Sequence, residues 1–129
     1  MMSNIKPFIK EHVIVSLAAG FTLAMMQEIC PEAKFIRALT NTPSALNSGT
    51  TTLTKGENTE EFMFKKVVEL FAMIGSSSVI EEKYMDLSTA LAGSGPAFFY
   101  AVADAFAKGC ENLGLDERTS LIMSAQTML

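Results

Sequence analysis

The chain has 129 residues and a mass of 14.0 kDa, with 49% hydrophobic and 19% charged residues, a composition that excludes intrinsic disorder. Its net charge of −4 and its scattered basic residues do not form the positive footprint of a nucleic-acid-binding protein. Residues 13–26 form the longest apolar stretch, but Ser16, Gly20 and Thr22 interrupt it, so we expect no membrane span. Residues 1–7 carry no secretory signal, and the default expectation is a cytoplasmic protein.

No self-contained catalytic or metal motif occurs in the sequence. The two cysteines, Cys30 and Cys110, lie far apart and form no CxxC pair, so reduced thiols are expected rather than a disulfide framework or a zinc site. His12 is the single histidine and stands at the start of a predicted strand, where a surface or core position is more common than catalysis. We therefore expect no catalytic side chain and no metal ligands.

The first part of the chain predicts a strand–loop–helix unit. Residues 12–17 form a short apolar run rich in β-branched residues, as in a strand buried on both faces of a parallel sheet. Small residues 18–20 follow, and Thr22 is a suitable N-cap for a helix over 23–29 that ends before Pro31. Ligands of open α/β sheets bind at the carboxyl ends of strands, so this loop is the first candidate site.

Further strands and a helix follow in alternation. Residues 34–39 predict a second strand, the Thr-Asn-Thr-Pro turn 40–43 ends it, and 50–54 predict a third. A helix is expected to begin within 58–61 and to end at Gly75, followed by a short strand over 78–80. Its apolar stripe is expected to comprise Phe62, Val67, Leu70, Phe71 and Ile74.

From Glu82 onward the pattern becomes helical, with helices predicted over 84–91, 97–113 and, capped by Asp116, 117–129. The Gly-Ser-Gly-Pro segment 93–96 lacks the lysine and spacing of a phosphate loop, and a junction between two helices fits it better. The helix over 97–113 is apolar on most sides, so it needs further chain or a second subunit to cover Phe98, Phe99, Tyr100 and Phe106. We expect a domain boundary near residue 82, which divides the chain into residues 1–82 and 83–129.

The order of several motifs resembles the pyrroline-5-carboxylate reductase family. The matching segments are Ala18–Gly20, Phe35–Pro43 and Glu82–Phe98, and later Ala105–Cys110, Leu113–Leu115 and Ala125–Thr127. The resemblance implies the C-terminal end of a Rossmann-type NAD(P)-binding domain followed by the start of an all-helical dimerisation domain. It also implies a homo-oligomer through the C-terminal helices, and reduction of pyrroline-5-carboxylate to L-proline with NADP or NAD as cofactor.

By the same resemblance, Leu17, Ala18, Ala19 and Asn41 face the cofactor, and Glu82 and Thr89 lie near the substrate. Two simpler interpretations stay open, namely that Thr89 only bonds the helix backbone and that Glu82 is a solvated acid. The family's glycine-rich dinucleotide motif and its later Ser-Pro-Gly-Gly-Ala-Thr loop do not occur in this sequence. We therefore expect the chain to correspond to the middle of the enzyme and to be inactive by itself.

Two other functions compete with this hypothesis. One is a non-catalytic assembly module, in which the helices rich in Ala and Phe pair with another subunit. The other is a different NAD(P)-linked dehydrogenase with a helical second domain, although the spacing of Asn41, Glu82 and Gly93 argues against it.

Overall fold

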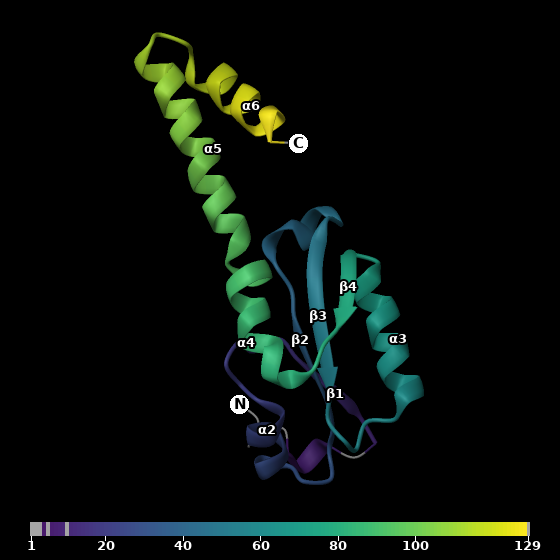
Figure 1. Cartoon of the computed structure of the whole chain (residues 1–129). Coiled ribbons are helices and arrows are strands. Elements are labelled where there is room, and N and C mark those ends of the chain that lie inside the picture. The colour runs from purple at the N-terminus through teal and green to yellow at the C-terminus, as the bar shows by residue number, and fades with distance from the viewer. Residues whose placement is uncertain (1–3, 5, 10, 129) are drawn as a thin grey trace. The chain divides into compact units, whose positions relative to one another are not determined.

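The computed structural model describes residues 4, 6–9 and 11–128, and the chain divides into two compact units, residues 1–93 and 94–129 (Figure 1). The first unit holds a four-stranded sheet with helices on both faces, and the second holds two long helices. A mixed α/β fold followed by helices is what the sequence predicts. The boundary near residue 82 stays a prediction, because a family domain and a compact unit need not share their limits.

The sheet runs in the order β1 (Val13–Ser16), β2 (Lys34–Leu39), β3 (Gly49–Lys55) and β4 (Gly75–Val79). β1 is parallel to β2, β2 is antiparallel to β3, and β3 is parallel to β4. β2 and β3 are buried along most of their length, whereas β1 is only half-buried. The prediction that β1 is buried on both faces is therefore wrong for the described residues, in which it pairs with β2 alone.

The two faces of the sheet carry different apolar clusters, because successive residues of a strand point to opposite sides. Phe35 packs against α2 (Leu23–Ile29), in a cluster with Leu23, Met26, Cys30 and Ala33. Ile36 points the other way, toward α3 (Glu61–Ala72), in a cluster with Ala38, Leu53 and Phe64. The helix α2 begins as predicted, with Thr22 Oγ1 accepting from the backbone N–H of Met25 at 3.2 Å.

α3 differs from its prediction in two respects. Its inward stripe is Phe64, Val67, Val68 and Phe71, while Phe62 and Leu70 are mostly exposed. The observed stripe follows the i, i+3, i+4, i+7 spacing more closely than the predicted one. Gly75 does not end the helix but begins β4, with φ at +143°. A Cβ on Gly75 would overlap the backbone of Gly49, its partner on β3, so glycine is required there by close strand approach.

The segment after β4 is helical with little interruption. A 3₁₀ turn at Glu82–Tyr84 leads into α4 (Met85–Ser88) and a π-helical turn at Thr89–Gly93. Only Ser94 separates this turn from α5 (Gly95–Asn112), so the glycine–proline segment is a narrower break than predicted. The last helix, α6 (Glu117–Thr127), is capped as predicted by Asp116, whose carboxylate accepts from the N–H of Thr119 at 3.0 Å.

The second unit has little interior of its own. α5 and α6 pack on each other through Ala107, Ser120 and Ser124, the buried residues of the pair. Their other faces carry exposed apolar side chains, among them Phe98, Phe99, Phe106, Leu121 and Ile122. Within the described ranges, no helix is both long enough and apolar enough to cross a membrane.

Candidate functional site

The loop after β1 presents its backbone to the surface. Leu17 is 55% exposed, and Ala18 and Ala19 are exposed as well. Ser16 Oγ accepts from the N–H of Ala18 at 3.3 Å, and Gly20 has a positive φ of 72° with open space where a Cβ would stand. Small side chains and the glycine leave this turn sterically open to a ligand.

Asn41 follows β2 at the same edge of the sheet, because β1 and β2 are parallel. Its Nδ2 donates to the carbonyl of Ala92 at 3.0 Å, and its Oδ1 accepts from the N–H of Thr50 at 2.9 Å. The carboxamide thus ties the turn after β2 to the start of β3 and to the π-helical turn. Its polar atoms are already engaged in holding the wall of this edge.

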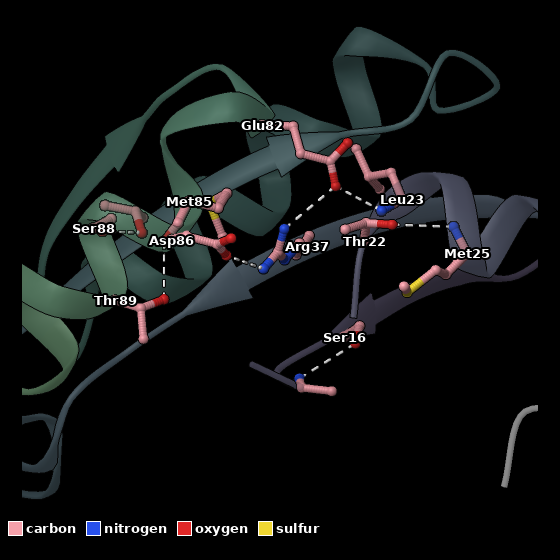
Figure 2. A network of polar contacts seen from close by, with 12 residues as sticks. Ser16, Thr22, Leu23, Met25, Arg37, Glu82, Met85, Asp86, Ser88 and Thr89 are labelled. Atoms are coloured by element: carbon pink, nitrogen blue, oxygen red, sulfur yellow. Dashed lines mark hydrogen bonds and ion pairs between the residues drawn. The ribbon is translucent and has the colours of Figure 1, made fainter. Parts of the chain in front are cut away.

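Glu82 is not a freely solvated acid. Its Oε1 accepts from the N–H of Leu23, the first residue of α2, at 2.6 Å and faces Arg37 Nη1 at 3.4 Å (Figure 2). The side chain keeps 31% of its surface exposed. Glu82 therefore connects the helix that follows the β1 loop with the central strand β2.

Arg37 is the residue of this network that sequence reasoning did not single out. It lies within β2, only 3% exposed, and pairs with Glu82 and with Asp86 Oδ1, the latter at 3.3 Å (Figure 2). One signal could have found it. An arginine inside the apolar run Phe35–Leu39 cannot lose its charge and needs a buried or half-buried carboxylate nearby.

Thr89 makes the bond that its simpler interpretation predicts, donating from Oγ1 to the carbonyl of Met85 at 2.9 Å. Because a hydroxyl has one proton, its remaining capacity toward a ligand is that of an acceptor. Beside it, Ser88 Oγ lies 2.8 Å from Thr52 Oγ1, a contact that fastens α4 to β3. These bonds set α4 on the α2 side of the sheet.

A pocket of about 580 Å³ opens beside this network. Glu82 and Leu23 line it, together with Gln27, Lys55, Asn58 and Glu81. Of the predicted site residues only Glu82 lines this pocket; the other five, Leu17, Ala18, Ala19, Asn41 and Thr89, do not. The structure thus joins Glu82 to the start of α2, and Asn41 to the turn that contains Thr89.

An exposed loop at the carboxyl ends of two parallel strands is where open α/β sheets bind their ligands, of which dinucleotides are one class. Comparison with known proteins makes the class specific. Residues 82–129 match the family model "Pyrroline-5-carboxylate reductase dimerisation". The chain is 36% identical over 130 residues to a pyrroline-5-carboxylate reductase of Glycine max, covering 100% of the chain and 47% of that protein. It is 31% identical to that of Methanosarcina acetivorans, covering 48% of it.

Solved structures agree with the sequence matches. The pyrroline carboxylate reductase of Plasmodium falciparum, solved with NADP bound, has a TM-score of 0.93 at 27% identity, over 98% of this chain and 52% of that one. The enzyme of Streptococcus pyogenes has a TM-score of 0.90 at 29% identity, over 98% of this chain and 50% of that one. The chain spans about half the length of the relatives that it matches.

The resemblance indicated by the sequence motifs is therefore confirmed, and the chain corresponds in sequence and fold to part of a pyrroline-5-carboxylate reductase. The predicted fold class is confirmed with it, as the C-terminal end of a Rossmann-type domain followed by a helical dimerisation domain.

Proposed function

We propose that this chain supplies the nicotinamide-side and substrate-side walls of a pyrroline-5-carboxylate reductase, the enzyme that reduces a cyclic imine to L-proline. The observation that carries the proposal is the carboxylate of Glu82, which is held by the buried Arg37 and by the N–H of Leu23, just after the β1 loop. The match of the whole chain to reductases of that name supports the substrate. We also propose that the domain boundary lies at residue 82, where the family match begins.

The residues present fit one end of an NADP or NAD molecule. The exposed residues Leu17, Ala18 and Ala19 and the turn held by Asn41 suit a flat nicotinamide ring. No GxGxxG segment occurs in the sequence to receive the pyrophosphate. When bound, the reduced cofactor supplies a hydride for the imine carbon. The part of this chain is to orient the two reactants at the edge of the sheet and to limit the access of water to them.

The two candidate substrate residues, Glu82 and Thr89, both offer acceptors. Glu82 offers a carboxylate. The hydroxyl of Thr89 donates its one proton to the carbonyl of Met85 and can only accept from a ligand. Acceptors suit a ligand that carries an N–H donor and a positive charge, which describes both a protonated cyclic imine and the secondary ammonium group of L-proline. A carboxylate at this position stabilises the cation in substrate and product alike.

We expect the chain to be inactive on its own, because it spans about half of its relatives and carries no pyrophosphate-binding motif. NADPH oxidation, followed by absorbance with pyrroline-5-carboxylate present, tests this expectation, and sustained turnover by the chain would contradict it. Titration of the labelled chain with NADPH and with L-proline tests the site. Shifts are expected at the amides of Leu17–Gly20 for NADPH and near Glu82 for L-proline, and the absence of both would refute the site.

A second candidate function is assembly without catalysis, and the exposed apolar faces of α5 and α6 favour it. We propose that these helices pair with another copy of the chain, whichever function holds. Size-exclusion chromatography with light scattering separates the outcomes. A concentration-independent monomer would contradict pairing, whereas an oligomer that binds neither NADPH nor L-proline would favour assembly alone.

We further propose a cytoplasmic location. Both cysteines are unpaired, Cys30 within the α2 cluster and Cys110 on the surface, and this state suits a reducing compartment. Fractionation of cells expressing the chain with a tag is the test, and its recovery in a membrane or secreted fraction would count against the proposal.

A further inference from the structure

The side chain of Arg37 occupies an unusual place for a permanent charge. It stands on β2 two residues after Phe35 and so points to the α2 side of the sheet, where it is 3% exposed. A guanidinium stays protonated in a protein and presents its N–H donors in a rigid plane. Its position therefore determines where the two partner carboxylates, Glu82 and Asp86, can lie.

The two carboxylates are held to different degrees. Asp86 is 85% exposed and meets Arg37 through one oxygen, so water can replace that contact at little cost. Glu82 is less exposed and receives two donors, the N–H of Leu23 and Nη1 of Arg37, from different directions. Without the guanidinium, one backbone N–H alone would orient it.

Both contacts of Glu82 converge on the same oxygen, Oε1 (Figure 2). Oε2 takes part in neither of these contacts. A carboxylate anchored through one oxygen has a defined direction for the other, as a positioned acceptor requires. The start of α2 follows directly on the β1 loop, so the same anchor relates Glu82 to that loop.

We propose that Arg37 is a positioning residue, which orients Glu82 so that its free carboxylate oxygen accepts from the cationic nitrogen of a cyclic imine or amine. The inference rests on the proposed function, since it assigns Glu82 to the substrate. It adds a residue that touches neither ligand and acts through Glu82 alone. A purely structural arginine would instead fasten α4 to the sheet without affecting ligand selectivity.

The test compares Arg37→Met with Lys34→Met. Lys34 is a matched control, because it is a cation of the same strand that also pairs with two carboxylates, Glu11 and Glu60, and does not touch Glu82. L-proline and NADPH are titrated separately into each chain by NMR. The Arg37→Met variant is expected to weaken L-proline binding about tenfold, equivalent to one charge-assisted hydrogen bond, and to leave NADPH binding unchanged. Equal weakening of both ligands, or of neither, would overturn the proposal.

A double-mutant cycle with Glu82→Gln separates action through Glu82 from independent packing. We expect Arg37→Met to have little further effect on L-proline binding once Glu82 is neutral, because its effect passes through that carboxylate. Additive losses would contradict this route. Arg37→Lys serves as the second variant, and it should recover part of the binding, because an ammonium can reach one carboxylate but lacks the planar fork.

A readout without ligand separates failure of the inference from failure of the proposed function. The amide of Leu23 donates to Glu82, so Arg37→Met should shift its resonance and speed its hydrogen exchange, while Lys34→Met should do neither. If the unmodified chain binds no L-proline, the substrate role fails and the Leu23 amide alone decides the positioning role. An unchanged Leu23 amide in Arg37→Met would refute positioning in either case.

Discussion

Arg37 and Glu82 are unequal partners, since Arg37 is 3% exposed and Glu82 31%. Replacing Glu82 by Ala leaves a buried guanidinium with only the exposed Asp86, and we expect a loss of roughly 3 kcal/mol in the free energy of unfolding. Replacing Arg37 by Met removes the buried charge itself and should cost no more than about 1 kcal/mol. Urea unfolding measures both, and a larger loss for Arg37→Met than for Glu82→Ala would contradict the expectation that the uncompensated guanidinium is the costlier charge.

Both polar atoms of the Asn41 carboxamide are engaged, because Nδ2 donates to Ala92 and Oδ1 accepts from Thr50. In Asn41→Asp the oxygen facing Thr50 N is kept, but the other oxygen meets the carbonyl of Ala92, so two acceptors face each other. We expect a loss of about 2 kcal/mol. Asn47→Asp is the control, because Asn47 is exposed. Thermal unfolding should separate the two variants, and equal midpoints would argue against the bridging role.

At the scale of the element, the cap of α6 makes its first turn sensitive to acid. Hydrogen bonds from Thr119 hold the pKa of the Asp116 carboxyl below its ordinary value of 3.8. A lowered pKa in the folded chain means that the carboxylate stabilises α6 above the unfolded pKa. That contribution is lost as the pH falls through the lower, folded value.

Asp116→Asn supplies the comparison, because asparagine also caps a helix but does not titrate in this range. Below pH 3.8 the amides of the first turn of α6 are expected to lose protection against hydrogen exchange in the unmodified chain. In the variant they should keep the protection that they have at higher pH. Identical acid profiles for the two chains would show that the cap does not titrate as proposed.

The elements were predictable where a local signal determines them. Thr22 and Asp116 are caps with a side-chain oxygen at the required place, and the β2 run is apolar and bounded by turn residues. The sequence predicts a helix end at Gly75 because a glycine after a helix usually ends it, whereas the glycine is required here by its close approach to Gly49, far away in sequence. The predicted stripe of α3 is wrong because Phe62 and Phe64 are the same residue type, and only the structure shows that Phe64 faces the sheet while Phe62 is exposed.

At the scale of the whole molecule, the exposed phenylalanines of α5 predict self-association. The double substitution of Phe98 and Phe99 by Ser should weaken association at least tenfold, roughly the effect of losing one well-packed aromatic contact. Leu46→Ser is the control, because Leu46 is 81% exposed but lies in the first unit. Analytical ultracentrifugation over a concentration series measures both, and equal dissociation constants would contradict pairing through α5.

The candidate site is predictable from the sequence only in part, because it depends on contacts between segments that are far apart in the chain. Motif order placed Leu17, Ala18, Ala19, Asn41, Glu82 and Thr89 as candidates, and their roles remain predictions. The pairing of Arg37 with Glu82 joins residues that are 45 positions apart. No periodicity or spacing in the sequence predicts such a pair. It depends on how α4 packs on the sheet, through contacts such as that between Thr52 and Ser88.

The glycines facing each other at the start of β3 and β4 also restrict how these strands can align. A parallel pair has no hairpin between its strands to select one register, and slippage by one residue would reverse the side of every β4 side chain. Gly49 lies opposite Gly75, and a slip that brought Ser76 there would drive a methylene group into the Gly49 carbonyl. A pairing shifted by one residue in this direction is thus opposed by a steric clash at the first residue of β4.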